Sequence, residues 1–156
     1  MQSVISIVPY SEIYGNAFRE LNEEWIRKYF TIEEMDRKTL DHPKENIIDK
    51  GGYIAVATID EEPVGVCALI PCSYDGFDFE LSKMGVSPKA QGKGVGKLLG
   101  LHIIEKAKSL GASTLFLESN RKLAPALSLY RKLGFEEMVP IASPYARSDI
   151  QMFLRL

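Results

Sequence analysis

The stretch MGVSPKAQGKGVGKLLG, residues 84–100, decides the fold. It joins a β-prone segment that ends at Val86 to a helix-like segment, through a Ser87-Pro88 break and three glycines within residues 92–96. Glycine lets the backbone approach a ligand without a Cβ in the way, and the N–H groups at a helix start favour an anion. The stretch therefore predicts a strand, a phosphate-binding turn and a helix, in that order.

Two other glycine-rich phosphate motifs do not fit this turn. A Walker P-loop needs Ser or Thr after its Lys, whereas Gly96 is followed by Lys97 and Leu98. A dinucleotide fingerprint needs Gly-x-Gly-x-x-Gly, whereas Gly92, Gly94 and Gly96 occupy every second position. A nucleotide-phosphate enzyme is therefore disfavoured, and a plain tight turn remains the structural alternative.

Length and composition limit the class of protein. The 156 residues fit one domain, residues 1–156, since domains commonly have about 100 to 150 residues. A net charge of −2, with 46% hydrophobic and 26% charged residues, indicates a globular protein with no overall attraction to nucleic acid. No apolar run approaches the roughly 18 residues that span a membrane, and no signal sequence is evident. We therefore expect a cytoplasmic protein without a membrane partner.

The two cysteines, Cys67 and Cys72, are too few for a disulfide framework. Their C-x4-C spacing lacks the second ligand pair of a zinc site. We expect two free thiols and no metal.

Hydrophobic periodicity predicts alternating helices and strands. From Gly52 onward the order is a β-meander, a helix, a strand, a helix and a terminal strand pair, which indicates a mixed α/β (α+β) domain. Expected helices cover residues 13–29 after a cap at Ser11, a short segment from Pro43 to Gly51, and residues 95–110 and 123–133. Expected strands cover residues 4–8, 53–59, 64–70, 77–86, 114–117, 135–139 and 150–154.

A further helix is expected after Phe30. Thr31-Ile32-Glu33-Glu34 has the T-x-x-E form of a capping box, in which the first and fourth side chains satisfy helix N–H groups. The sequence therefore predicts that Thr31 caps a helix that starts at Ile32 and runs toward Leu40.

The strand over residues 77–86 changes its alternation. Phe79 and Leu81 are apolar at odd positions, but Met84 and Val86 are apolar at even ones. Because side chains alternate between the two faces of a strand, a change of parity predicts a bulge around residues 82–83. Bulges often re-aim groups beside active sites.

Two separated motifs resemble the GNAT superfamily of N-acetyltransferases. Gln91-x-x-Gly94-x-Gly96 follows Met84-Gly85-Val86, and Asn120 precedes Leu129-Tyr130-Arg131-Lys132-Leu133-Gly134-Phe135. The resemblance covers about residues 53–139. It implies a central mixed, mostly antiparallel sheet, flanked by helices and splayed between its fourth and fifth strands, with acetyl-CoA in the split as acetyl donor.

The resemblance also assigns the donor site. N–H groups of the turn would bind the pyrophosphate of CoA, the strand before it would pair with the pantetheine arm as if with an added strand, and Asn120 would bond the same arm. Solvated lysines and a turn-forming asparagine are the structural alternatives. The implied cofactor-binding residues are Met84, Gly85, Val86, Gln91, Gly92, Lys93, Gly94, Val95, Gly96, Lys97 and Asn120.

Tyr130 is the implied general acid. Acetyl transfer to an amine expels a thiolate, whose thiol has a pKa of about 8.5, and a phenol with a pKa of about 10 can donate the proton. The Leu-Tyr-x-Lys-Leu-Gly-Phe context matches the family's position for this acid. An aromatic at helical spacing can instead belong to the core.

Glu80 is the general base implied by the resemblance, and Glu118 is a weaker candidate. The acceptor amine arrives protonated and must lose a proton before it attacks. An ion pair between Glu80 and Lys83, a surface position and a water chain as base are the alternatives. A main-chain N–H around Met84 would stabilise the developing oxyanion.

The N-terminal helices and the last loop would line the acceptor pocket, through Trp25, Tyr29, Tyr145 and Arg147, with Phe30 and Asp149 nearby. Arg147 could hold a substrate carboxylate through two hydrogen bonds. All could instead be packing or surface residues.

The sequence therefore predicts an acetyl-CoA-dependent N-acetyltransferase that moves acetyl to a primary amine by direct attack in a ternary complex. A small metabolite or amino-acid-like acceptor is favoured, and polyamines, antibiotics and peptide termini stay open. A homodimer is possible, since final strands in similar proteins often pair across dimers. The alternative is a non-catalytic acyl-CoA-binding sensor or interaction module.

Overall fold

The computed structural model describes residues 4–156, and their centre is a seven-stranded sheet with the order β1-β2-β3-β4-β5-β7-β6. Neighbouring strands are antiparallel, except for the parallel pair β4 and β5. The mixed, mostly antiparallel sheet inferred from the sequence is confirmed. The strands are β1 (Ile5–Pro9), β2 (Tyr53–Ile59), β3 (Glu62–Pro71), β4 (Phe79–Val86), β5 (Thr114–Ser119), β6 (Glu136–Glu137) and β7 (Ile150–Arg155).

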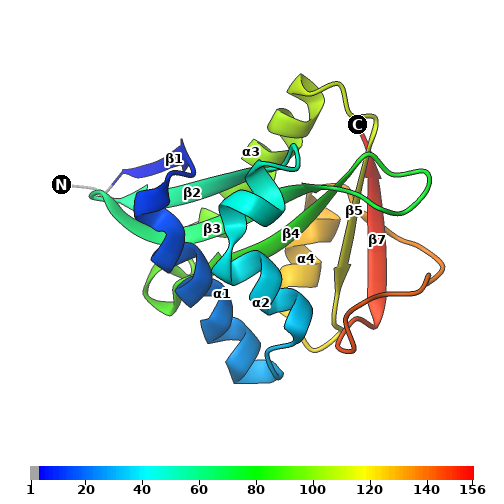
Figure 1. The fold of residues 1–156 in the computed structure, drawn as a ribbon, viewed down its shortest axis with the longest axis horizontal. Coiled ribbons are helices and arrows are strands. Elements are labelled where there is room, and N and C mark those ends of the chain that lie inside the picture. The colour runs from blue at the N-terminus through cyan, green and yellow to red at the C-terminus, as the bar shows by residue number, and fades with distance from the viewer. Residues whose placement is uncertain (1–3) are drawn as a thin grey trace.

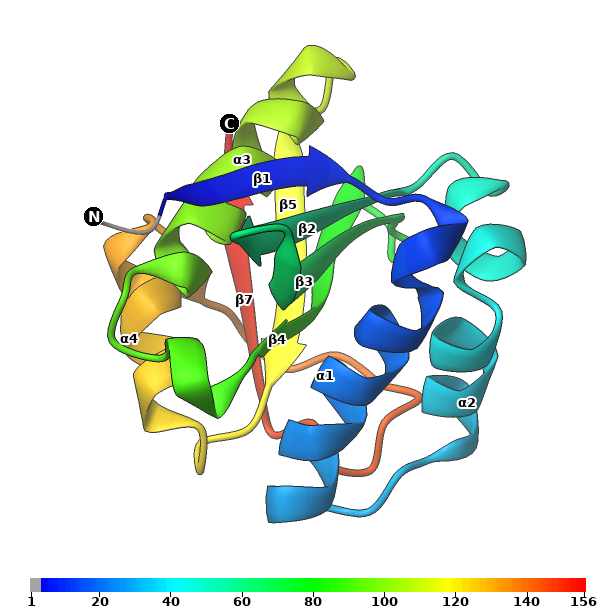
Figure 2. The ribbon, with the colours of Figure 1, turned by 90° about the vertical axis from the view of Figure 1, so that its left-hand side faces the viewer.

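Helices cover both faces of the sheet. Figure 2 shows α1 (Gly15–Tyr29) and α2 (Glu34–Asp41) on one side, and α3 (Val95–Ser109) and α4 (Ala124–Lys132) on the other. Short helical segments join the larger elements: the 3-10 turns η1 (Glu12–Tyr14) and η3 (Pro88–Ala90) and the π-helical turn η2 (Lys44–Ile48).

The sheet separates two apolar cores because its central strands are buried on both faces. On β2, Ala55 and Ala57 pack on the side of α3, while Ile54 and Val56 pack on the side of α1. A strand buried on both faces is a continuous apolar run, as residues 54–57 are. Each core holds its pair of helices against one face of the sheet.

The sheet opens between β4 and β5. Their pairing is limited to Phe79 with Leu115 and Glu80 with Phe116, and the two strands then diverge toward the lower edge in Figure 1. Beyond Glu80, β4 therefore has no partner strand on that side. The splay implied by the resemblance is confirmed.

The bulge predicted in β4 is present. Val66 of β3 lies opposite Gly85 and Ala68 lies opposite Ser82, so one β3 residue faces both Lys83 and Met84. Lys83 has φ of 54°, a left-handed conformation that is uncommon for a side-chain-bearing residue. Beyond the bulge, Met84 packs in the same core as Leu81, which is the change of face that the apolar pattern indicated.

Several boundaries differ by one to three residues from the sequence predictions, among them the start of α2 and the end of β6. The prediction that Thr31 caps the second helix is wrong: α2 begins at Glu34, and Glu33 is the cap, with its N–H donating to Asp36 Oδ2 at 2.8 Å. Tertiary partners of Asp36, described below, fix this later start. The strand expected over residues 135–139 shortens to β6, although the N–H of Met138 still donates to the backbone oxygen of Gln151 at 3.0 Å.

We expect Gly85→Ala to lower the free energy of unfolding by about 1 to 3 kcal/mol, the usual cost of overpacking. A Cβ on Gly85 would lie 2.8 Å from the backbone oxygen of Leu21, so α1 would have to move away from β4. Urea unfolding measures the change. The control is Gly15→Ala, in helical conformation with only the Tyr10 hydroxyl at 3.3 Å, which should leave stability equal or higher. Equal losses in both variants would contradict the close packing of α1 on β4.

Candidate active site

The split between β4 and β5 forms a cleft of about 600 Å³. Its walls come from both strands, the start of α3, one face of α4, the end of α1 and the loop before β7. Of the eleven residues that the sequence assigns to the donor, all but Lys93 line this cleft. One cleft therefore brings together groups spread over most of the chain.

The glycine turn leaves its backbone open to the cleft. Gly92 and Gly94 have φ of 80° and 79°, and a Cβ built on either would meet nothing within 4 Å. At the start of α3 the first helical bond runs from Leu98 N–H to Gly94 O at 3.1 Å. The N–H groups of residues 95–97 thus have no acceptor within the helix, and no side chain caps this end. These donors fit a phosphate group.

Gly96 and Gly100 have a packing role. A Cβ on Gly96 would lie 3.1 Å from Leu129, and one on Gly100 would lie 2.6 Å from Leu133. Both contacts let α3 lie close against α4. The last glycine of the turn therefore also sets the distance between α3 and α4, the helix that carries Tyr130.

Asn120 lines the cleft, but its amide already has partners in the chain. Nδ2 donates to the backbone oxygen of Arg147 at 2.7 Å, and Oδ1 accepts from Lys122 N–H at 2.8 Å. The side chain therefore fixes the turn after β5 and holds the loop before β7. Bonding to the pantetheine arm stays a prediction.

Tyr130 lies in the last turns of α4 and is 8% exposed. Its ring meets Phe135 edge to face, with centroids 6.1 Å apart. Burial, with a smaller contribution from Cys67, raises the pKa of its hydroxyl, so the phenol keeps its proton at neutral pH. Within the described chain the hydroxyl has no hydrogen-bond partner, and the side chain borders the cleft.

Glu80 and Glu118 enter the cleft from the two strands that separate. Glu80 lies beside Phe116, and Glu118 follows two residues later on the same face of β5. Burial and the charge of Glu118 raise the pKa of Glu80 to about 8, although Lys83 opposes the shift. The Ser143 hydroxyl donates to Glu118. A carboxyl group with a raised pKa thus lies where an acceptor amine could reach it.

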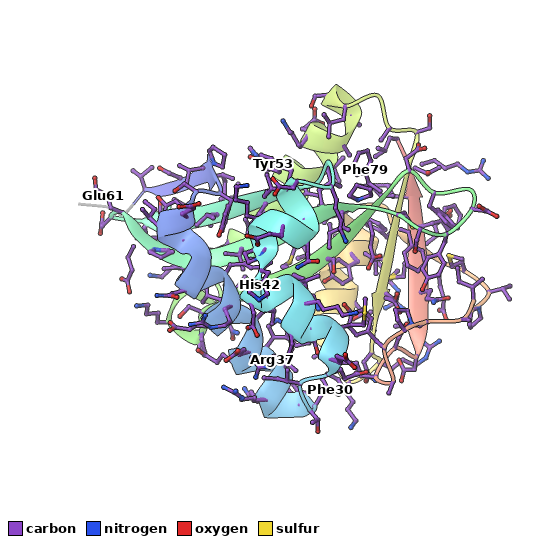
Figure 3. The ribbon with its side chains drawn as sticks, viewed as in Figure 1. Phe30, Arg37, His42, Tyr53, Glu61 and Phe79 are labelled. Carbon is purple, nitrogen blue, oxygen red and sulfur yellow. The ribbon has the colours of Figure 1, made fainter. Side chains whose placement is uncertain are left out.

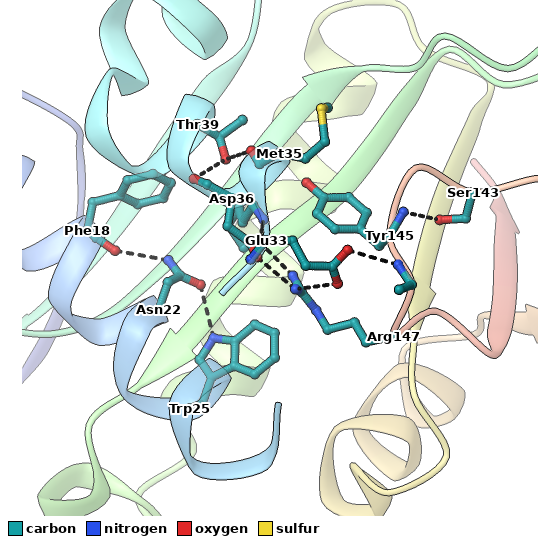
Figure 4. A network of polar contacts seen from close by, with 12 residues as sticks. Phe18, Asn22, Trp25, Glu33, Met35, Asp36, Thr39, Ser143, Tyr145 and Arg147 are labelled. Carbon is teal, nitrogen blue, oxygen red and sulfur yellow. Dashed lines mark hydrogen bonds and ion pairs between the residues drawn. The ribbon is translucent and has the colours of Figure 1, made fainter. Parts of the chain in front are cut away.

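A buried ion cluster closes the far end of the cleft (Figure 4). Asp36 is fully buried and accepts from Arg147 through Nη1 at 2.7 Å and Nη2 at 2.6 Å. Lys83 Nζ donates to the same carboxylate at 2.6 Å, with its side chain 3% exposed. Burial alone would raise the pKa of Asp36, but these two cations outweigh it and lower the pKa to about 2. Asp36 is therefore ionised at any ordinary pH.

Aromatic rings pack against the cations of this cluster. The Arg147 guanidinium lies 4.8 Å from the Tyr145 ring centroid and 5.6 Å from that of Trp25, and Lys83 Nζ lies 4.7 Å from the Tyr145 centroid. Trp25 is oriented by a hydrogen bond from its Nε1 to Asn22 Oδ1 at 3.0 Å. Stacked rings and ion pairs together hold the loop before β7 on α1 and α2.

The Acetyltransferase (GNAT) family model matches residues 16–135, most of the chain. The chain belongs to the GNAT acetyltransferase family. The matched range includes β4, its bulge, the glycine turn and Tyr130.

One curated relative is similar over most of both chains. YvbK of Bacillus subtilis (strain 168), an N-acetyltransferase, is 35% identical over 120 residues, which are 74% of this chain and 72% of that protein. The chain spans about half the length of the first two curated relatives it matches, 57% and 50%.

Solved structures show the same fold. A GNAT acetyltransferase of Staphylococcus aureus Mu50 has a TM-score of 0.85 at 22% identity, covering 97% of this chain and 99% of that one. YncA of Salmonella typhimurium, solved with its cofactor acetyl-CoA, has a TM-score of 0.74 at 19% identity, covering 97% and 93%.

The residues present fit acetyl-CoA, the acetyl donor that the resemblance implies. The open turn and the uncapped start of α3 suit its phosphates, and the unpaired edge of β4 offers backbone groups to an extended arm. No metal-binding cluster of His, Cys, Asp or Glu occurs among residues 4–156. No helix in this part of the chain is long and apolar enough to cross a membrane.

The acceptor side agrees less well with the sequence. All four residues expected to contact the acceptor line the cleft: Trp25, Tyr29, Tyr145 and Arg147. The guanidinium of Arg147 is not free for a substrate, however, because it donates to Asp36 and, at 3.2 Å, to Glu33 Oε2. The structure also shows the importance of Asp36 and Lys83, which sequence reasoning missed as a pair. The change of parity at Lys83 was the one available signal. It indicated the bulge, but it did not indicate that Asp36 is the partner of Lys83.

We expect Asp36→Asn to lower the free energy of unfolding at pH 7 by about 3 to 5 kcal/mol, because Lys83 and Arg147 would lose their shared counter-charge. The folded pKa of Asp36, about 2, lies below the unfolded value of about 3.9. Its contribution is therefore present above pH 4 or so and disappears as the pH falls toward 2. Urea unfolding over this range should show a steeper loss for the unmodified protein than for the variant.

The control is Asp41→Asn on the same helix. Asp41 is partly exposed and pairs with Arg37 at 3.5 Å, so its loss should cost less than about 1 kcal/mol. Similar losses at both positions would show that the buried cluster contributes no more than a surface pair.

Proposed function

We propose that the protein is an N-acetyltransferase that moves acetyl from acetyl-CoA to a primary amine by direct attack in a ternary complex. One observation carries this: Glu80 and Tyr130 line the same cleft, where the bulge of β4 and the start of α3 also meet. A proton acceptor, a proton donor and an anion site are the three parts that this transfer needs.

Glu80 takes the proton of the amine. A base works best when its pKa lies near the operating pH, and a pKa of about 8 meets this condition better than an ordinary carboxylate does. An arriving ammonium would also compensate the neighbouring charge of Glu118. The neutral nitrogen can then attack.

The amine nitrogen attacks the acetyl carbonyl carbon, so a C–N bond forms while the C–S bond breaks. A main-chain N–H near Met84, re-aimed by the bulge, stabilises the negative charge on the acetyl oxygen. Tyr130 donates its proton to the departing sulfur, giving free CoA thiol. As the intermediate collapses, the nitrogen gives up its second proton to solvent, which leaves the neutral amide. The first proton remains on Glu80 until solvent removes it, and the phenol is reprotonated from solvent.

Tyr130→Phe should lower kcat by about 10²- to 10⁴-fold while the Kd for CoA stays within about twofold, because the ring and its contact with Phe135 remain. Thiol release and titration calorimetry give the two values. An unchanged kcat would remove Tyr130 from the mechanism. CoA binding without thiol release from any amine, in the unmodified protein, would favour the non-catalytic acyl-CoA module.

Glu80→Gln should lower kcat/KM and abolish its rise through a pH of about 8, because protonated Glu80 cannot accept a proton. The titration of the amine is common to both proteins, so the difference between their pH profiles isolates Glu80.

Glu118→Gln is the matched variant. The charge of Glu118 raises the pKa of Glu80, so its removal should move the midpoint of the profile to lower pH without abolishing it. A midpoint that survives Glu80→Gln would assign the base to another group.

A further inference from the structure

The cations buried at the acceptor end of the cleft are already neutralised within the chain. Lys83 and Arg147 share Asp36, and Arg147 also binds Glu33, whose Oε1 accepts the N–H of Ala146 at 2.9 Å. Two cations thus face two carboxylates. Releasing Arg147 to a substrate would leave a fully buried Asp36 with a single cationic partner, which is costly.

Glu80 and Glu118 are the carboxylates left over. Neither makes an ion pair within residues 4–156, and the polar bond of Glu118 is with the neutral Ser143 hydroxyl. Lys83 acts on Glu80 only through its charge, and its Nζ is committed to Asp36. Glu118, joined by Glu80 at a pH above about 8, therefore leaves the uncompensated charge at this end of the cleft negative.

The remaining cations lie elsewhere on the cleft wall. Lys97 belongs to the start of α3, at the donor end. Lys28 and Lys122 are exposed at the mouth, over the rings of Tyr29 at 5.3 Å and Phe30 at 5.6 Å. Solvent screens exposed charges far more than buried ones, so these lysines weigh less than the two glutamates.

We infer that the acceptor is an amine whose body carries no carboxylate or phosphate, such as a diamine or an amino alcohol, rather than an amino acid. This inference rests on the proposed acetyl transfer to an amine. The ammonium group binds near the two glutamates. A carboxylate or phosphate on the same small acceptor would lie beside them as well, and no free buried cation is there to neutralise it. The amino-acid-like acceptor favoured by the sequence depended on Arg147, which the structure pairs with Asp36.

Three four-carbon amines with different ends test this inference: 1,4-diaminobutane, 4-amino-1-butanol and 4-aminobutanoate. We expect kcat/KM for thiol release to be at least about tenfold higher for the first two than for the carboxylate, because like charges repel in a desolvated site. Equal or better use of 4-aminobutanoate would overturn the inference.

The glutamates can be tested directly by Glu118→Gln, with Glu61→Gln as the matched control. Glu61 lies at the exposed β2–β3 turn, far from β5 in Figure 3, so its loss changes the net charge equally but leaves the cleft intact. The comparison is made at a pH of about 9, where Glu80 is ionised with or without Glu118, so that only the charge of Glu118 changes. The ratio of kcat/KM for diamine over aminobutanoate should then fall about threefold or more with Glu118→Gln and stay constant with Glu61→Gln. A merely structural role of Glu118 would lower both substrates equally and contradict the inference.

Failure of the proposed function gives a different result. If none of the amines releases thiol, the transferase proposal fails. Calorimetry of the same amines with the CoA-saturated protein then decides the inference by itself: weakest binding of 4-aminobutanoate supports it, and equal or tighter binding overturns it.

Discussion

The carboxylate of Asp36 is the group on which the acceptor side of this protein depends. It holds Lys83 and Arg147, which arrive from β4 and from the loop before β7, while its own position fixes the start of α2. Without that carboxylate the two cations would repel each other in a buried site. One side chain therefore connects a helix, the bulge and the covering loop.

This cluster also anchors the bulge of β4. Lys83 has a left-handed backbone, and its side chain is anchored at 2.6 Å to Asp36, so the peptide that follows it has a defined direction. That direction decides where the Met84 N–H points. The backbone group proposed to stabilise the oxyanion thus follows directly on a residue whose side chain is held by an ion pair.

Local patterns allowed much of the fold and the donor site to be predicted from the sequence. The glycine turn, the change of parity in β4 and the helical stripe over residues 95–110 each depend on neighbours in the chain, and the structure has all three. The start of α2 and the partners of Arg147 could not be predicted in this way. Both depend on Asp36, whose partners become neighbours only after folding, and no short window of sequence contains them together.

The two halves of the cleft also differ in the length of chain that must close to build them. The donor turn and the helix start lie within residues 84–100, whereas the bond between Arg147 and Asp36 spans 111 residues. Loop-closure entropy and contact order favour short-range contacts during folding. The glycine turn can therefore form early from its own segment, but the ion cluster around Asp36 exists only once the loop that carries Arg147 has packed on α2.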